Sequence, residues 1–203
     1  MSSKSVTTTL ENLSRHGFAV FFVETREEAL VKAKEFIPLH SSVGLGGSES
    51  VKQVGLLEYV LGRDDLVVFN QYEDGISLEE NMERRRKGLL SDVYLTSTNA
   101  ITEDGYLVNV DGSGNRLAAF AYGPKRVLVI AGVNKIVPTV EAGFRRIEEI
   151  AAPLNVERLN KRAATFGKEQ KYTIDTVNNQ FLYTKRSEKR RIVVVLVGEE
   201  LGY

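Results

Sequence analysis

Three short runs of apolar residues constrain the fold of this chain more than any other feature. They read FAVFFV at residues 18–23, VLVIAGV at 127–133 and IVVVLV at 192–197. Each run is far shorter than the roughly 20 apolar residues that a membrane-spanning helix needs. Their length and their β-branched residues are typical of strands that are buried on both faces of a parallel sheet. We therefore expect buried strands at these three places.

Segments with helical periodicity separate the strand-like segments along most of the chain. We expect helices at 3–15, 25–37, 50–61, 77–90, 114–123 and 138–160, the last one interrupted near Pro153, and further strands at 41–45, 66–70 and 92–98. This alternation predicts an α/β fold with a mainly parallel sheet flanked by helices. A length of 203 residues suits a single domain, 1–203, in which about 160–190 is a less regular segment, a flap or a hairpin.

Composition excludes several classes of partner and cofactor. The chain has 27 basic and 27 acidic residues, so no long-range attraction to nucleic acid or to an anionic membrane is expected. It has no cysteine and only two histidines. We therefore expect no cofactor and no thiolate-held or His-rich metal site, although a carboxylate-held magnesium ion stays open. The N-terminal stretch lacks the apolar segment of a signal peptide, and a cytoplasmic location is expected.

Glycines follow a predicted strand in the segment GLGGSES, residues 44–50. In open α/β sheets, ligands bind beyond the carboxyl ends of the strands, where glycines let the backbone approach an anion and helix starts offer unpaired N–H groups. The spacing matches neither a dinucleotide fingerprint nor a P-loop. Two interpretations stay open: a tight strand-to-helix turn, or a ligand-binding loop with Gly44, Gly46, Gly47 and Ser48.

The stretch NAITEDGYLVNVDGSGNR, residues 99–116, combines a hairpin with a strand-to-helix connection. Asp104-Gly105 is typical of a hairpin turn, and a helix capped by Asp111 or Ser113 explains part of the rest. Neither feature explains why further polar residues gather here. We predict that the stretch is the rim of a ligand site, with Arg116 either facing the site or turned outward to a surface carboxylate. The predicted rim consists of Asn99, Asn109, Asp111, Gly112, Gly114 and Asn115, and we expect Asn99, Gly112 and Gly46 to line one pocket.

A third polar segment follows the strand expected at 125–132. Asn134 and Lys135 come directly after it, and Lys135 would neutralise a carboxylate or a phosphate if it faces the site. The alternative is a solvated loop lysine. The charged run ERRRK, residues 83–87, is predicted to be the solvated face of a helix, and we assign no role to the two histidines.

Four segments together span nearly the whole chain: VGLGGSESVKQVGLLEYV, SDVYLTSTNAITEDGYLVNVDGSGNRLAAFAYGPKRVLVIAGVNKIV, AAPLNVERLN and VVVLVGEELGY. In this order they resemble the lactate-utilisation (LUD-domain) proteins of the YkgG type. The resemblance implies a NagB/RpiA/CoA-transferase-like fold. It also implies a link to lactate and organic-acid utilisation, with iron–sulfur oxidoreductase subunits as partners. It implies no particular catalytic activity for the chain itself.

Two departures from similar sequences bear on function. The segment TSTNAITEDGYLVNVDGSGN also resembles, more distantly, the site segment of methylthioribose-1-phosphate isomerase, where a catalytic Asp occupies the place of Asn99. Because Asn99 cannot ionise, the chemistry of that isomerase is not expected here. After Leu159 and Asn160, where other members of the family carry a cysteine cluster, this chain has no cysteine. Any metal function of that cluster is therefore lost or supplied by a partner.

Two hypotheses of function remain. In the first, the chain is a subunit that binds a small anionic metabolite, either an organic acid or a phosphorylated compound; the lack of a recognisable nucleophile–base pair favours it. In the second, it is a stand-alone enzyme, an isomerase or transferase acting on sugar phosphates or acyl-CoA-type substrates. The candidate acids and bases would be Glu49, Asp104, Asp111 and Lys135. The oligomeric state stays open, with a homodimer as one alternative.

Overall fold

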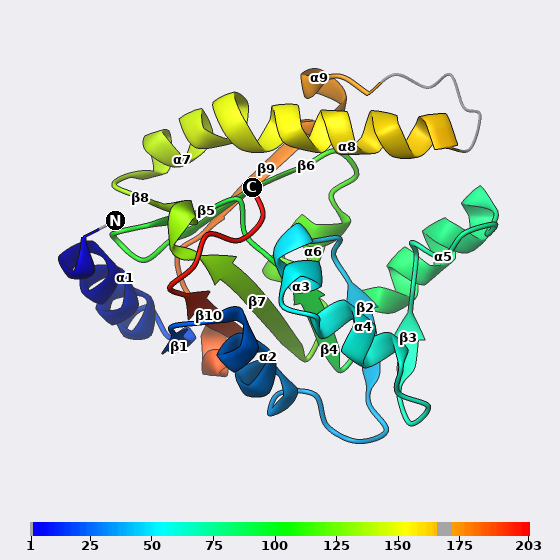
Figure 1. The fold of residues 1–203 in the computed structure, drawn as a ribbon, viewed down its shortest axis with the longest axis horizontal. Helices are drawn as coiled ribbons and strands as arrows, with labels where there is room; N and C mark the ends of the chain where they lie inside the picture. The colour runs from blue at the N-terminus through cyan, green and yellow to red at the C-terminus, as the bar shows by residue number, and fades with distance from the viewer. Residues whose placement is uncertain (1, 166–171) are drawn as a thin grey trace.

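A six-stranded parallel sheet forms the centre of the computed structural model, which describes residues 2–165 and 172–203 (Figure 1). The strand order is β1-β10-β7-β4-β2-β3, and each neighbouring pair is parallel. The strands are β1 (Ala19–Val23), β2 (Ser42–Leu45), β3 (Val67–Phe69), β4 (Val93–Thr96), β7 (Arg126–Gly132) and β10 (Ile192–Val197). The expected α/β fold with a mainly parallel sheet is confirmed.

Strand β10 shows why the apolar runs form the centre of this sheet. It pairs with β1 on one side and β7 on the other, and all its residues are buried. Alternate side chains enter two different cores: Val193, Val195 and Val197 on one face, and Ile192, Val194 and Leu196 on the other. A strand covered on both faces has no solvent side for polar residues, which accounts for the unbroken apolar run.

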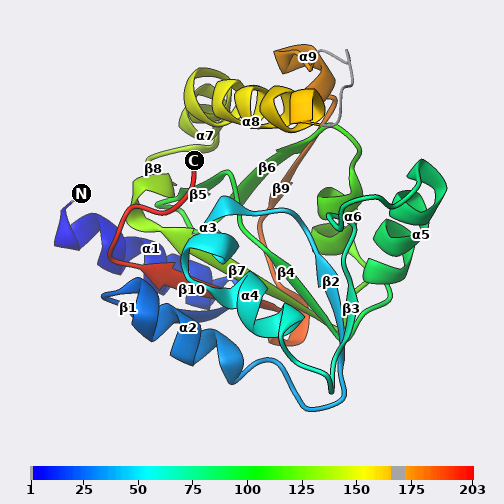
Figure 2. The same cartoon turned by 45° about the vertical axis from the view of Figure 1, so that its right-hand side comes forward.

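Helices cover both faces of the main sheet (Figures 1 and 2). On one face, α2 (Arg26–Lys34), α3 (Glu49–Gln53) and α4 (Leu56–Leu61) share a core with the sheet. On the other face, α1 (Ser3–Arg15) and α6 (Asn115–Ala121) do the same. Helix α5 (Leu78–Gly88) packs beside β2 so closely that a side chain at Gly44 would meet the Gly88 carbonyl and the Tyr94 ring.

A second sheet, in the order β8-β5-β6-β9, shares the core of α1 and α6. Strands β5 (Ala100–Thr102) and β6 (Leu107–Asp111) form the predicted hairpin, in which Gly105 has a φ of 81°. Strand β8 (Ile136–Val137) is parallel to β5, and β9 (Gln180–Thr184) is antiparallel to β6. Strand β9 was not predicted from the sequence, and it falls in the segment expected to be less regular. Residues 166–171 of that segment lie outside the described residues.

A long helical segment packs on the second sheet through a separate core (Figure 2). It consists of α7 (Val140–Arg146), a π-helical turn (Ile147–Ala151) and α8 (Ala152–Thr165), with the short α9 (Ile174–Val177) beside it. Proline removes an N–H and crowds the carbonyl four residues before it, so the wider turn ahead of Pro153 replaces the predicted break. In the described part of the chain, no helix is long and apolar enough to cross a membrane.

Two local predictions need correction. The strand at 18–24 was expected to be buried on both faces, but β1 is an edge strand and Phe22 is 38% exposed. The helix at 50–61 is two short helices, because Gly55 takes a left-handed conformation between them. Thr25 Oγ1 accepts from the N–H of Glu28 and caps α2, whereas the Glu28 carboxylate accepts from the N–H of Glu24, so the two residues form no complete capping box.

Candidate functional site

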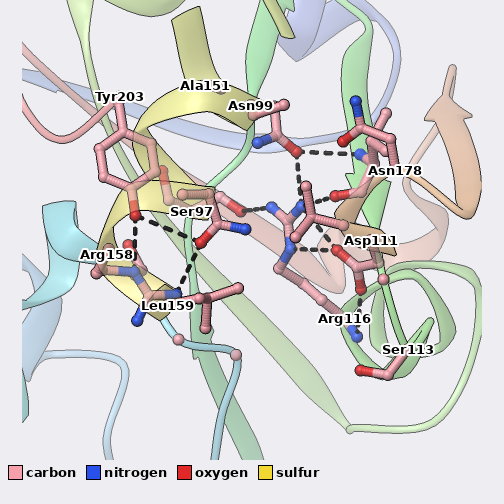
Figure 3. Close-up of a pocket in the computed structure, with 18 of the residues that line it drawn as sticks. Ser97, Asn99, Asp111, Ser113, Arg116, Ala151, Arg158, Leu159, Asn178 and Tyr203 are labelled. Atoms are coloured by element: carbon pink, nitrogen blue, oxygen red, sulfur yellow. Dashed lines mark hydrogen bonds and ion pairs between the residues drawn. The ribbon is translucent and has the colours of Figure 1, made fainter. Parts of the chain in front are cut away.

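A cavity of about 440 Å³ opens where three neighbouring strands of the main sheet end (Figure 3). Gly46, Ser97 and Lys135 lie just beyond the carboxyl ends of β2, β4 and β7 and line it. Other parts of the cavity wall come from residues of the segment 147–159 and from Tyr203. Ligands of open α/β sheets bind at this edge, and the volume is within the range of small-molecule sites.

Most of the residues predicted to bind a ligand lie on this one cavity. It is lined by eight of them, namely Gly46, Gly47, Ser48, Asn99, Asp111, Gly112, Asn115 and Lys135. The expectation that Gly46, Asn99 and Gly112 line one pocket therefore holds. Four do not line it: Gly44, Asn109, Gly114 and Asn134.

Each of those four residues has a structural role instead. Gly44 allows the close packing of α5 on the sheet. The Asn109 side chain is fully buried, and its Oδ1 accepts from the N–H of Asn99 and from Arg116. Gly114 has a φ of 75° at the start of α6, and Asn134 Oδ1 accepts from the N–H of Leu201 and so fixes the C-terminal segment.

Arg116 is the centre of a hydrogen-bonded group that we call the Arg116 cluster: Arg116, Asp111, Asn99, Asn109 and the carbonyl groups of Ser97 and Val110. Nε donates to Asp111 Oδ1 at 2.9 Å. Nη1 donates to Ser97 O and Asn109 Oδ1, both at 3.0 Å, and Nη2 donates to Asn99 Oδ1 at 2.6 Å and to Val110 O at 2.8 Å. A guanidinium has five N–H donors, so these bonds leave none for a ligand. Arg116 thus turns inward and stabilises the wall.

The other polar members of the Arg116 cluster are partly committed as well. Asp111 Oδ2 accepts from the N–H groups of Arg116 and Leu117 and so caps α6. With both oxygens engaged, Asp111 is a poor candidate for a general base. Asn99 Oδ1 accepts from Arg116 and from the N–H of Val110, whereas its Nδ2 points away from Arg116 and has no partner among the described residues (Figure 3).

Lys135 is the most unusual ionisable group on the cavity. Its side chain is 2% exposed, and Nζ lies 3.1 Å from Ser50 Oγ, 3.0 Å from Ser97 Oγ and 3.3 Å from Thr98 O. No Asp or Glu of the described residues forms an ion pair with it. Burial, and to a lesser degree the positive charges of Arg146 and Arg116, together lower the pKa of Lys135 to about 7.

The glycine loop is packed against the protein and also exposed to the cavity. Gly47 has a φ of 66°, and a Cβ there would collide with the hydroxyl group of Tyr72. Tyr72 Oη accepts from Gln71 Nε2 at 2.7 Å, and burial raises the pKa of the phenol. Ser48 Oγ accepts from the N–H of Val51 as the cap of the five-residue α3. The tight-turn interpretation is therefore sufficient to explain these glycines.

Sequence reasoning missed Arg85, which lines the cavity from α5. Its Nη1 donates to Ser113 Oγ at 2.9 Å, whereas its Nε is buried without a partner among the described residues. In the described part of the chain, no carboxylate forms an ion pair with Arg85. The run 83–87 is therefore not uniformly solvated: Arg86 is 70% exposed, but Arg85 faces the cavity.

Arg158 and Tyr203 are further cavity residues that the sequence analysis did not select. Arg158 donates from Nε to Tyr203 Oη and from Nη2 to Asn155 Oδ1, both at 2.8 Å (Figure 3). Its Nε also lies 3.8 Å from Glu49 Oε1. Among the residues that the structure describes, the cavity is lined by two carboxylates, Glu49 and Asp111, and by four basic residues, Arg85, Arg116, Lys135 and Arg158.

Asp104 lies elsewhere, at the tip of the β5–β6 hairpin. This tip rests on α1, where Asn12 Nδ2 donates to Glu103 O at 2.8 Å and the His16 ring lies 3.1 Å from Gly105 O. Asp104 does not line the cavity and is removed from the candidate acids and bases. Within 2–165 and 172–203, no group of three or more His, Cys, Asp or Glu side chains could hold a metal ion.

Comparisons with known proteins agree with this architecture. The family model described as LUD domain matches residues 6–197. A solved structure described as a DUF162 family protein from Deinococcus radiodurans is 16% identical, with a TM-score of 0.55 over 98% of this chain and 99% of that chain. At this identity the likeness shows the fold alone. No curated protein matches the chain. Since the family model covers nearly the entire sequence, the chain belongs to the LUD-domain family.

Proposed function

We propose that the cavity binds a small anionic metabolite, either an organic acid or a phosphorylated compound. The observation that carries the proposal is Arg85, which lines the cavity and has no carboxylate partner among the described residues. A guanidinium group that lacks a counter-charge attracts a carboxylate or a phosphate, to which it can donate two parallel hydrogen bonds. The excess of cations on the cavity wall supports the same conclusion, because a carboxylate or phosphate would complete the charge balance there.

The proposed ligand connects the chain with lactate and organic-acid utilisation. This connection is supported by the family's association with such pathways and by the size of the cavity. Because this chain has no cysteine, an iron–sulfur centre would have to reside on a partner subunit. We propose that the chain serves such a partner as its ligand-binding subunit.

Calorimetric titration with lactate, pyruvate and inorganic phosphate tests anion binding. Arg85→Gln removes the unpaired cation, and its expected effect on affinity is a loss of about 10- to 100-fold, the value of a hydrogen bond to a charged group. The matched control is Arg86→Gln, one residue further in the same helix but exposed, which is expected to change affinity less than about twofold. Equal losses in the two variants, or no binding to the unaltered protein, would refute the proposal.

Lys135 favours a second candidate function, a stand-alone enzyme. A lysine that is buried and close to other cations is typical of activated amines in catalytic sites. Turnover of sugar phosphates or acyl-CoA esters by the purified chain would establish this function and would contradict a purely accessory role. Glu49 is then the remaining acidic candidate on the cavity.

A further inference from the structure

We propose that Lys135 Nζ forms an imine with the carbonyl carbon of a small anionic aldehyde or ketone in the cavity. The inference rests on the proposed anion binding and adds the substrate class: the ligand carries a reactive carbonyl group as well as a negative charge. The cavity provides a group for each part. Arg85 and Arg158 are suited to the anion, and Lys135 is suited to the carbonyl.

The first argument is the environment of the amine. A lysine attacks a carbonyl only as the neutral amine, and a neighbouring carboxylate would hold it as ammonium. Lys135 is in contact with two hydroxyls and one carbonyl oxygen instead of a carboxylate. Arg146, which is 8% exposed and bonded to the carbonyl groups of Asn99 and Asn134, adds positive charge nearby. Burial and this charge lower the pKa of Lys135 to about 7, which makes the neutral form accessible near neutral pH.

The second argument is the orientation of the two hydroxyl groups. Ser50 Oγ donates to Leu201 O at 3.2 Å, and Ser97 Oγ donates to Thr98 O at 3.3 Å. Each hydroxyl group thus donates its proton to a backbone carbonyl group. Neither has to donate to Lys135 Nζ, so the lone pair of the neutral amine stays available to attack a carbonyl carbon. Ser97 also lines the cavity, so its hydroxyl is placed to carry a proton between nitrogen and the ligand oxygen.

The chemistry balances without an oxidant or a reductant. The Nζ lone pair forms a bond to the carbonyl carbon, and the π electrons of the C=O bond move to oxygen. One proton passes from nitrogen to that oxygen and gives a carbinolamine. A second proton from nitrogen leaves with the hydroxyl group as one water molecule, and a C=N bond remains.

Reductive trapping tests the inference on the full chain. The protein is incubated with pyruvate or dihydroxyacetone phosphate and treated with cyanoborohydride, and the adduct is located by peptide mass mapping. We expect one adduct, on Lys135, whose yield falls at least tenfold when excess lactate or phosphate occupies the cavity. Lys135→Met is expected to lose it. Lys125→Met is the matched control, and this variant should keep the adduct on Lys135. The Lys125 side chain is 80% exposed and forms an ion pair with Asp92.

The outcomes separate this inference from the function on which it rests. If calorimetry shows that pyruvate binds but the trapped adduct is absent from Lys135 or spread over exposed lysines, the imine is refuted and the proposed anion binding stands. If neither pyruvate nor phosphate binds, the proposed function itself fails. Circular dichroism checks the fold of Lys135→Met. If that variant unfolds, the position of the trapped adduct in the unaltered protein decides whether the imine forms on Lys135.

Discussion

Arg116 and Lys135 are buried cations on the same cavity wall, yet their surroundings differ in kind. Arg116 has a carboxylate and four further acceptors, one for each of its N–H donors. Lys135 has only neutral acceptors, and other cations lie close by. A compensated buried cation stabilises a fold, whereas an uncompensated one costs stability and is retained where a ligand or a reaction uses it. The comparison indicates a structural role for Arg116 and supports the chemical role that we propose for Lys135.

The largest expected effect comes from removing the compensated cation. Arg116→Met leaves Asp111 buried without its counter-charge and deprives Asn99 and Asn109 of a donor. We expect the free energy of unfolding in urea to fall by about 3–5 kcal/mol. Arg86→Met, at an exposed position, should cost less than about 0.5 kcal/mol. Similar losses in the two variants would show that the Arg116 cluster does not stabilise the wall.

A smaller effect, specific to pH, is expected from the uncompensated cation. The folded-state pKa of Lys135, about 7, lies below its unfolded value, so between these values the unfolded state binds more protons and stability rises with pH. From pH 7 to pH 9 the gain is about 2 kcal/mol, and below the folded pKa it levels off. Lys135→Met should remove this gain, and Lys125→Met should retain it. Parallel stability curves for the unaltered protein and Lys135→Met would contradict the assignment.

The smallest effect is expected at Asn99, which is hydrogen-bonded to Arg116 and also lines the cavity. Asn99→Asp keeps an acceptor for Arg116 but replaces the amide that points away from it by a carboxylate. Unfolding free energy should change by less than about 1 kcal/mol. Affinity for inorganic phosphate, measured by calorimetry, should fall about two- to fivefold through like-charge repulsion, and the loss should shrink at high salt. An unchanged affinity would place Asn99 outside the binding surface.

The sequence predicts those features that local patterns determine. The central strands, the β5–β6 hairpin and the polar loops at the strand ends follow from apolar runs, an Asp-Gly turn and glycines, and their meeting at one edge follows from parallel topology. Strand β9 could not be found in this way, because it is stabilised by pairing with β6, which lies about 70 positions earlier. Long-range pairing leaves little trace in a single short segment.

Side-chain direction explains the remaining gaps. Arg85 and Arg86 are neighbours of the same type, and only the rotation of about 100° per residue in a helix sends one to the cavity and the other to solvent. The position of that helix relative to β2 depends on the contact at Gly44 and Gly88, which the local pattern does not reveal. For the same reason, the sequence could not decide between an inward and an outward Arg116, or between a buried and a solvated Lys135.

The π-helical turn at Ile147–Ala151 shows that the cavity wall depends on residue number as well as residue type. Ile147, Ala151, Asn155 and Leu159 all line the cavity at intervals of four, a spacing that drifts around an ordinary α-helix by about 40° per step. The wider turn offsets part of that drift. Five residues of the wider turn rotate the chain about as far as four α-helical residues, so deleting one residue here would restore a regular helix and keep Arg158 beside Tyr203. Deleting one residue between this turn and Arg158 would instead rotate Arg158 by about 100° and move it away from Tyr203 without any change in its own identity. In evolutionary terms, a single insertion or deletion in this helix is a route by which related chains could exchange one set of wall residues for another.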